Sequence, residues 1–340
     1  MSNTIESKIV ELDSPRNIII RSEILELSKL KSNEMAGRTL YSAISPGTEI
    51  AAYIGDPPLR PMKVYPRVVG YCNVAEVIAI GDNVKQYKVG DKILNFQSHR
   101  TSFICTEESI GALIPEGADL AEAATTYLFH LGYNALLKGD FKPGMSVAVV
   151  GLGTVGLTST ALASSFGGVT YAFSNQMNSL KIARELGAES VFRKSDSGLK
   201  EKIYDLTDGG IDLVISTSGS WEDWRLAVSI ARKEGTVCVI GFPGRTQPIA
   251  DFNPLDSQYF YDSQLRIISC GHTSTLDVAT HEIRFNIKRN CAFLLKEIIQ
   301  NKIPATSIIS SVVPWNELQS VYEAMASRTP GLVTSVLKWD

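Results

Sequence analysis

Short apolar runs alternate with helix-like segments through the middle of the chain. The apolar runs are rich in β-branched residues and predict strands at 147–150, 169–173, 190–193, 211–217 and 236–241. Between them, apolar residues recur at helical spacing and glycine-containing stops follow, which predicts helices at 178–186, 199–207 and 221–233. Strands that alternate with helices of this length predict a parallel, doubly wound α/β sheet.

The first of these strands ends in a glycine-rich turn, GLGTVG, which leads directly into a helical pattern. Gly151 permits a tight turn, Gly153 lets the backbone approach a pyrophosphate, and Gly156 lets the helix pack closely on the sheet. Thr154 and Val155 then open a helix N-terminus, whose N–H groups favour phosphate. The spacing predicts a dinucleotide-binding Rossmann domain. A glycine turn in some other α/β domain is the alternative.

The first part of the chain follows a different pattern. Short β-rich segments separated by proline and glycine turns predict strands at 17–21, 38–42, 70–80, 91–95 and 102–106, and so a twisted antiparallel or barrel-like domain. Beyond residue 275, a helix at 285–300 and a strand at 332–337 are expected to return to this domain. The expected organisation is a β-rich domain at 1–122, a Rossmann domain at 123–275 and a C-terminal return at 276–340.

Composition and charge restrict the class of protein and its partners. The 340 residues are 44% hydrophobic and 20% charged, which is typical of a soluble globular protein of about two domains. A net charge of −3 gives no electrostatic basis for binding nucleic acid or an anionic membrane. No apolar stretch approaches the ~20 residues of a membrane span, and the first residues lack a signal-peptide pattern. We expect a cytoplasmic protein that acts on a small molecule.

The five cysteines are far apart in the sequence, and no two of them have CxxC spacing. They indicate neither a disulfide framework nor a four-cysteine zinc lobe. Cys105 and Cys238 fall within apolar strand-like runs, where we expect them to be buried as small hydrophobic residues.

Several short motifs carry a family resemblance when they are taken together and in order. They are ISPGTE at 44–49, PRVVGY at 66–71 followed by AEVIAIG at 75–81, KVGDKI at 88–93, the stretch from Tyr127 to GYNAL at 132–136, and the glycine fingerprint. In this order the chain resembles the medium-chain dehydrogenase/reductase superfamily along nearly its full length. The resemblance implies a β-rich GroES-like catalytic domain, a Rossmann domain and hydride transfer to or from a nicotinamide cofactor.

Within that superfamily the chain is most similar, in short motifs only, to the bacteriochlorophyllide-dehydrogenase-like branch, whose substrate we do not carry over. Zinc-using members place a cysteine, a His-Glu pair and a cysteine or aspartate where this sequence has Ser45, Tyr71-Cys72 and Tyr127. Catalytic zinc takes about three ligands from thiolates, imidazoles and carboxylates, and hydroxyl groups are poor substitutes. We therefore expect a member without zinc, and no metal ligands are assigned.

Reduction of a carbonyl by hydride builds negative charge on its oxygen, which hydrogen-bond donors must stabilise when no Lewis acid is present. Tyr71 and Tyr127 are candidate donors, or they fill the space that the metal site vacates. His130 is a candidate proton relay, or a histidine bonded to backbone beneath the cofactor. Ser45 and Thr48 are candidate ligands of a substrate oxygen, or members of a simple turn.

Three other titratable residues are interpreted as structural. His99 and His272 are expected on solvated loops, with a position bordering the cleft as the alternative. Glu49 is expected in a buried ion pair with an arginine, with acid–base chemistry as the alternative.

The preferred cofactor is predicted from the residues that follow the second Rossmann strand. NAD-binding domains usually carry an acidic residue about 20 residues beyond the glycines, whereas this chain has Ser174-Asn175-Gln176. Without a carboxylate to repel a 2′-phosphate, NADP(H) is favoured over NAD(H). Ser174 and Asn175 can donate to the phosphate, and Lys181 either adds charge or lies on a solvated helix face. No arginine stands next to Ser174 in the sequence.

Family analogy supplies two further expectations. Thr217, Ser218, Gly241 and Phe242 end strands whose carboxyl ends line the nicotinamide crevice. Similar family members form homodimers through the edge strands of their Rossmann domains, and the apolar segment 236–241 is a candidate for that edge.

The favoured function is a zinc-independent, NADP(H)-dependent oxidoreductase that interconverts a secondary alcohol and a ketone. Its substrate is expected to be a small polyfunctional metabolite such as a sugar, a cyclitol or a natural-product intermediate. One alternative is an enoyl- or quinone-type C=C reductase, although ISPGTE replaces the Asn-Pro-x-Asp-like loop of such enzymes. The other is a non-catalytic NADP(H)-binding redox sensor, since fold alone does not fix function.

Overall fold

The computed structural model describes residues 3–57, 64–242, 247–271, 281 and 283–339. The chain forms two compact units, one made of Met1–Tyr127 with Ser274–Asp340 and the other of Leu128–Thr273. The sequence predicts the two domain boundaries a few residues away from these positions, after residues 122 and 275. No helix in the described ranges has both the length and the apolar character needed to cross a lipid bilayer.

The first unit is built on a seven-stranded sheet in the order β15-β16-β3-β5-β6-β8, with β7 paired to β3. The strands are β3 (Glu34–Ala43), β5 (Cys72–Ile80), β6 (Lys92–Asn95), β7 (Ser102–Thr106), β8 (Ile110–Ile114), β15 (Ile309–Pro314) and β16 (Thr334–Lys338). All pairings are antiparallel except β15 with β16. The inward side chains of Met35, Val77 and Phe103 form a core between the central strands.

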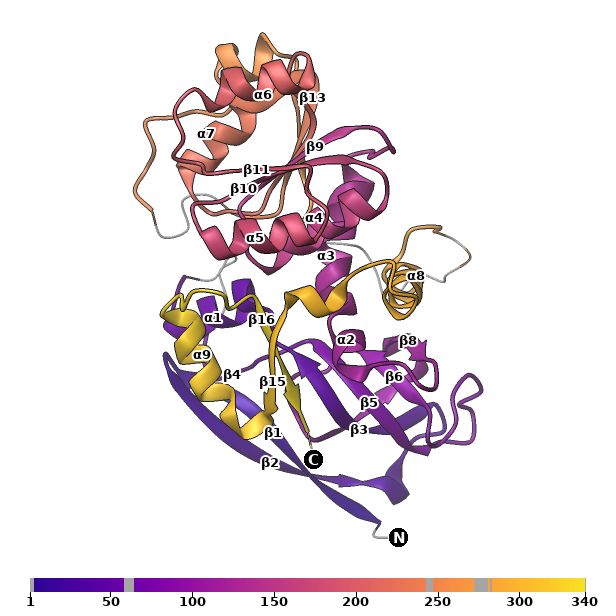
Figure 1. The fold of residues 1–340 in the computed structure, drawn as a ribbon. Helices are drawn as coiled ribbons and strands as arrows, with labels where there is room; N and C mark the ends of the chain where they lie inside the picture. Colours follow the sequence, from indigo (N-terminus) through magenta and orange to yellow (C-terminus); the bar gives the residue numbers. More distant parts are fainter. Residues whose placement is uncertain (1–2, 58–63, 243–246, 272–280, 282, 340) are drawn as a thin grey trace. The chain divides into compact units, whose positions relative to one another are not determined.

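A second, three-stranded sheet in the same unit has the order β2-β1-β4. Its strands are β1 (Thr4–Ser14), β2 (Asn17–Glu26) and β4 (Arg67–Val68). The β1–β2 ribbon closes through a tight turn at Arg16, whose φ of 58° lies in the left-handed region. Figure 1 shows the ribbon as two long strands, with β2 on its outer side.

The helices of the first unit are α1 (Pro46–Ile54), α2 (Leu120–Ala124), α8 (Ile287–Ile299) and α9 (Leu318–Ala326). Single 3-10 turns lie at Leu27–Lys29, Glu107–Ser109, Ala305–Ile308 and Trp315–Glu317. Helix α1 begins at a proline, as favoured in a first turn, and ends at Gly55 in the left-handed conformation. Tyr53 of α1 and Tyr322 of α9 meet edge to face, with ring centroids 5.2 Å apart, in the core beside Trp339.

The second unit contains a six-stranded parallel sheet in the order β11-β10-β9-β12-β13-β14. The strands are β9 (Ser146–Val150), β10 (Val169–Phe173), β11 (Ser190–Phe192), β12 (Ile211–Ser216), β13 (Ala231–Val239) and β14 (Arg266–Ser269). The helices are α4 (Thr154–Ser165), α5 (Met177–Glu185), α6 (Leu199–Thr207) and α7 (Trp221–Ile230), together with most of α3 (Thr126–Lys138), and a π-helical turn spans Ser257–Tyr261. The strand order reverses direction at β9, which confirms the predicted doubly wound α/β fold for this unit, and the first unit is β-rich as predicted.

Two expectations for this unit are wrong. The helix predicted at 221–233 ends at Ile230, because Ala231 already pairs with Ile211 in the sheet. The segment 236–241 is not at an edge, because β13 pairs with β12 on one side and with β14 on the other. The cysteine prediction is confirmed, since Cys105 and Cys238 are buried and unbridged.

Candidate functional site

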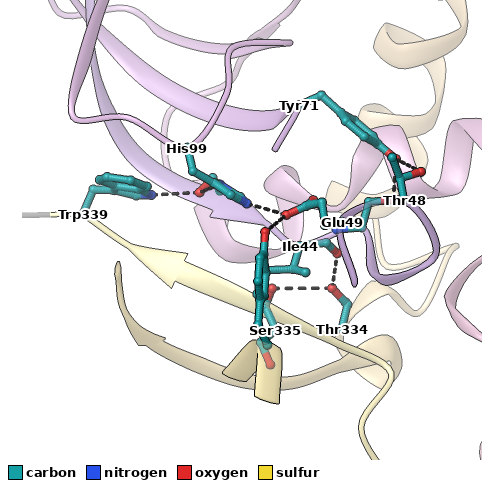
Figure 2. A network of polar contacts seen from close by, with 11 residues as sticks. Ile44, Thr48, Glu49, Tyr71, His99, Thr334, Ser335 and Trp339 are labelled. Atoms are coloured by element: carbon teal, nitrogen blue, oxygen red, sulfur yellow. Dashed lines mark hydrogen bonds and ion pairs between the residues drawn. The ribbon is translucent and has the colours of Figure 1, made fainter. Parts of the chain in front are cut away.

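Three of the predicted hydroxyl donors lie together where β3 leads into α1. Ser45 precedes the first residue of α1 and is almost fully buried, whereas Thr48 is exposed in the first turn. The Tyr71 hydroxyl donates to Ser45 Oγ and, more weakly at 3.4 Å, to Thr48 Oγ1. Figure 2 shows the Tyr71 ring directed toward this turn. The structure therefore brings Ser45, Thr48 and Tyr71 into one hydroxyl cluster.

Tyr127 completes an aromatic wall beside this cluster. Its ring meets Tyr71 edge to face, with centroids 5.5 Å apart, and meets Phe96 in the same manner at 5.1 Å. Burial raises the pKa of both tyrosine hydroxyls above their usual value, and the bonds from Tyr71 to Ser45 and Thr48 offset this only in part. Both side chains are therefore neutral phenols at physiological pH, which makes them hydrogen-bond donors.

A buried series of hydrogen-bonded polar side chains lies beside the hydroxyl cluster, with Glu49 nearest to Thr48 (Figure 2). Trp339 Nε1 donates to Ser42 Oγ at 2.8 Å, and Ser42 Oγ lies 2.8 Å from His99 Nδ1. His99 Nε2 lies 2.9 Å from Glu49 Oε2. Because Ser42 already accepts the tryptophan N–H, its own proton can go to Nδ1, and Nε2–H then donates to the carboxylate. The hydrogen bonds of this series of side chains therefore all point toward Glu49.

Glu49 also fixes the backbone of the loop. Its Oε1 accepts the Ser45 backbone N–H at 2.6 Å, and its Oε2 accepts the Tyr322 hydroxyl as well as His99. The carboxylate is 2% exposed and is thus satisfied by three donors from three separate segments. Glu49 positions Ser45, whose hydroxyl oxygen accepts the hydrogen bond of Tyr71.

The interpretations of His99 and Glu49 need correction. His99 is not on a solvated loop, because its ring is completely buried beneath Gly70, where an added Cβ would lie 2.6 Å from the imidazole. Glu49 is buried and paired as expected, but its partner is His99 rather than an arginine. His272 lies outside the described residues.

The glycine turn of the second unit has the geometry that a dinucleotide requires. Gly151 has a φ of 97°, and a Cβ on Gly156 would lie 1.9 Å from the Gly151 carbonyl oxygen. A Cβ on Gly153 would meet no atom within 4 Å, so one side of this backbone is open. Helix α4 begins at Thr154, is followed by Val155, and has no side-chain cap at Gly153. Its first N–H groups suit a phosphate, so this turn fits the pyrophosphate of a dinucleotide.

The structure adds a basic residue at the predicted ribose end. Ser174 and Asn175 follow β10, and Asn175 Oδ1 accepts the Ser195 backbone N–H at 3.1 Å. Phe173 pairs with Phe192, the last residue of β11, and the Phe192 carbonyl accepts the Ser174 N–H at 3.1 Å, so Arg193 follows the strand close to Ser174. Arg193 is exposed, and it enters no ion pair among the residues that the structure describes. Sequence inspection missed this arginine because it lies 19 positions beyond Ser174, although it ends a predicted strand.

Two lysines near this end differ in how firmly they are held in ion pairs. Lys181 is 79% exposed and lies 3.9 Å from Glu185, a loose pair on a solvated helix face. Lys194 Nζ is held between both carboxylate oxygens of Asp223 at 2.6 Å. Of these basic side chains, Arg193 is therefore the best placed to meet an anion beside Ser174 and Asn175.

The residues predicted at the nicotinamide end are linked to the glycine turn. Thr217 Oγ1 donates to the Gly151 carbonyl at 2.7 Å, and Ser218 Oγ accepts the Ser220 N–H at 3.2 Å. Gly241 lies so close to Thr217 that an added Cβ would be 2.5 Å from its carbonyl oxygen, and Phe242 follows with 43% of its surface exposed. These strand ends thus form one connected edge of the sheet with the glycine turn.

His130 lies on α3 and is completely buried. Burial lowers its pKa to about 4, because the charged imidazolium is disfavoured away from water. His130 is therefore neutral at physiological pH, and its role as a proton relay stays a prediction.

Comparisons with known proteins find dehydrogenases that are similar to this chain. Residues 154–283 match a family model described as "Zinc-binding dehydrogenase". A sorbitol dehydrogenase of Bacillus subtilis is 25% identical over 234 residues, an alignment that covers 59% of this chain and 65% of that relative. The match thus spans slightly less than two thirds of the relative's length.

Solved structures agree with the chain over nearly all of its length. The 2R,3R-butanediol dehydrogenase of Bacillus subtilis is 16% identical with a TM-score of 0.81, covering 98% of this chain and 100% of that one. A putative zinc-binding dehydrogenase from Sinorhizobium meliloti bound to NADP is 18% identical with a TM-score of 0.78, covering 98% and 99%. At these identities the likeness shows the fold alone, which this chain shares with those dehydrogenases.

Because the family model and the Sinorhizobium meliloti structure are described as zinc-binding, we compared the side chains of this chain with the ligands that zinc requires. In the part of the chain that the structure describes, no group of three or more His, Cys, Asp or Glu side chains is placed to hold a metal. The cluster at Ser45 and Tyr71 offers hydroxyls, and Glu49 and His99 are bonded to each other. Cys72 is buried, which raises the pKa of its thiol well above the usual value. These residues do not fit a catalytic zinc ion.

Proposed function

We propose that this chain, a homologue of the zinc-type medium-chain alcohol dehydrogenases, is an oxidoreductase that interconverts a secondary alcohol and a ketone with NADP(H) and without catalytic zinc. The observation that carries the proposal is the hydroxyl cluster of Tyr71, Ser45 and Thr48, in a chain whose family resemblance implies zinc ligands at the Ser45 and Tyr71 positions. A neutral phenol can do part of what a Lewis acid does, since it donates a hydrogen bond to a developing alkoxide.

In the proposed reaction, the Tyr71 hydroxyl donates to the substrate oxygen. Ser45 accepts the hydrogen bond of Tyr71 in the structure, and a substrate oxygen that gains charge would accept this hydrogen bond instead. Thr48 is exposed beside Tyr71 and supplies a second hydroxyl that can bind the substrate. Glu49 and His99 keep Ser45 in position and do not contact the substrate.

NADP(H) supplies or accepts the hydride when it is bound. The glycine turn of Gly151, Gly153 and Gly156 would hold its pyrophosphate, and Arg193, Ser174 and Asn175 would hold its 2′-phosphate. A guanidinium group suits a phosphate better than an ammonium group does, because it donates two parallel hydrogen bonds. The NADP bound to the Sinorhizobium meliloti structure supports this assignment.

The relatives support a small polyol or diol as the substrate. Sorbitol and 2R,3R-butanediol, named for two of them, both carry neighbouring hydroxyl groups. A cluster of three side-chain hydroxyls can bind such a substrate by hydrogen bonds to more than one of its oxygens.

Initial-rate measurements with NADPH and NADP⁺ against panels of polyols, ketones and enones test the proposal. Tyr71→Phe removes the donor and should lower kcat at least about 100-fold, as expected for loss of a group acting on the reacting oxygen. Tyr87→Phe, a change of the same kind at a partly buried tyrosine elsewhere in the unit, serves as the control.

Three results would contradict the proposal. Activity that disappears with a chelator and returns with zinc would overturn zinc independence. Turnover of enones alone would identify a C=C reductase. Tight NADPH binding without turnover of any substrate would identify a sensor.

A further inference from the structure

The outer strand of the β1–β2 ribbon has an open edge. β2 stands at one end of the sheet order β2-β1-β4, and across the described residues no backbone group pairs with its outer side. The strand is ten residues long and exposes large apolar side chains, with Ile20 46% and Ile24 62% exposed. A long, apolar, unpaired edge is a template for another strand, which folded proteins usually protect.

Contacts on the far side of β1 reveal which backbone groups of β2 are free. The Lys8 N–H bonds to Thr101 Oγ1 and the Lys8 carbonyl accepts the Thr101 N–H, so both groups of Lys8 point away from β2. Lys8 is paired with Ser22, which makes this a non-hydrogen-bonded pair. The N–H and C=O of Ser22 therefore face the open edge. The Val10 N–H bonds to the His99 carbonyl and so points away from β2. Val10 is paired with Ile20, so the backbone groups of Ile20 also face the open edge.

The sequence of this edge is complementary to itself. It reads Ile20-Arg21-Ser22-Glu23-Ile24, with opposite charges placed symmetrically about the serine. An antiparallel copy centred on Ser22 would place Arg21 opposite Glu23 of the second chain and Ile20 opposite Ile24. In this register Ser22 faces Ser22 of the second chain and Ile20 faces Ile24. These pairs form hydrogen bonds through the free backbone groups. Arg21 and Glu23 then form the non-hydrogen-bonded pairs, in which facing side chains lie closest.

We propose that two copies of this chain associate through their β2 strands, antiparallel and centred on Ser22. The pairing is isologous, because each Arg21–Glu23 and Ile20–Ile24 contact occurs twice about a two-fold axis. It would bury Ile24, which is the most exposed isoleucine of the ribbon, and would join the two three-stranded sheets into one. Arg21 and Glu23 are each about half exposed and lie 3.8 Å apart within their own chain, a loose ion pair that both can exchange for one with a partner.

The alternative dimer surface is the edge strand of the Rossmann unit, which family analogy predicts. Among the residues that the structure describes, that strand is β14, which has four residues, and Arg266 at its start pairs with Asp140 at 2.9 Å. A four-residue edge offers fewer backbone hydrogen bonds than the ten residues of β2.

The backbone pairing is tested by Ser22→Pro, measured by light scattering and sedimentation over a concentration series of the full chain. Proline removes the Ser22 N–H, which faces the open edge rather than β1, so the fold should tolerate the change. The dimer seen for the unchanged chain should become a monomer. Ser22→Ala is the matched control, because it removes only the hydroxyl bond to Glu6 and keeps the N–H. This variant should stay dimeric, and circular dichroism establishes that both variants fold.

The charge pairing is tested by reversal. Arg21→Glu and Glu23→Arg each place like charges opposite one another twice, so each should raise the dimer dissociation constant at least about tenfold. Mixing the two variants, or combining both changes in one chain, should restore association. Arg21 also bonds Glu11 at 3.1 Å within its own chain, but a defect of the fold would not be repaired by mixing.

A monomer at all concentrations would overturn the proposal. A dimer with an unchanged dissociation constant in Ser22→Pro and in the single charge reversals would also overturn it, because the interface would then lie elsewhere, for example at β14.

Discussion

Glu49 and His99 form a buried pair, 2.9 Å apart, between a helix that begins beside the hydroxyl cluster and a loop that precedes β7. His99 contacts Ser42, which is bonded to Trp339, and Glu49 accepts hydrogen bonds from Tyr322 and from the Ser45 backbone. The pair therefore links these residues to the loop at Ser45. A carboxylate that accepts from three donors is hard to replace, since every amide or apolar substitute leaves a buried donor unsatisfied.

Glu49→Gln should therefore destabilise the first unit by about 3 kcal/mol, because the amide N–H₂ group must face a donor from Ser45, His99 or Tyr322. Urea unfolding followed by tryptophan fluorescence measures the loss. Glu76→Gln is the control, since Glu76 pairs with Arg38 at the surface and should contribute less than about 1 kcal/mol. Equal losses in the two variants would contradict the central role of Glu49.

Arg193→Ala should weaken NADPH binding about 10- to 100-fold and leave NADH binding unchanged, because only NADPH carries the 2′-phosphate. Isothermal titration with both cofactors measures the selectivity. Lys181→Ala removes one positive charge from the neighbouring, solvated helix face and is the matched control. A larger effect from Lys181 would show that the wrong basic residue was assigned.

Ser174→Asp introduces the carboxylate that NAD-binding domains carry at this end of the sheet, and it should reverse the preference toward NADH. Thermal shifts with each cofactor provide the measurement. An unchanged order of the two shifts would mean that the ribose site lies elsewhere.

His130 should make stability fall on acidification. Its folded pKa of about 4 lies below the ordinary value of 6.5, so the unfolded chain binds the proton first as the pH falls. The stabilisation is fully present above about pH 6.5 and decreases toward pH 4, with a loss of about 2 kcal/mol at pH 5. His130→Phe should remove this part of the pH dependence. Denaturant unfolding of both proteins at neutral and acidic pH measures the difference, and parallel pH profiles would contradict the prediction.

Local signals predicted the elements and the glycine turn. The strand at 102–106 and the helix at 199–207 agree with β7 and α6 to the residue, and Gly151 and Gly156 have the conformation and close approach that their spacing implies. Such features depend on neighbours within a few positions, which a single sequence displays.

The surroundings of His99 could not be predicted in this way. Its partners Ser42 and Glu49 come from one end of the chain, and Trp339, behind Ser42, comes from the other. A polar stretch such as Gln97-Ser98-His99-Arg100 has the composition of an exposed loop whether or not distant segments cover it. Arg193 was missed for the same reason, because its nearness to Ser174 arises from strand pairing.

The pairing of β16 with β3 has a consequence for biosynthesis. Thr334 Oγ1 bonds the Ile44 carbonyl at 2.5 Å, and Trp339 bonds Ser42, so the last strand completes a sheet begun near the amino end. During translation all strands of the Rossmann unit are synthesised before β16 leaves the ribosome. Until then, β3 of the first unit lacks the strand that pairs with it on one side. We therefore expect nascent chains to pass through a stage in which the Rossmann unit can fold while the first unit is still incomplete.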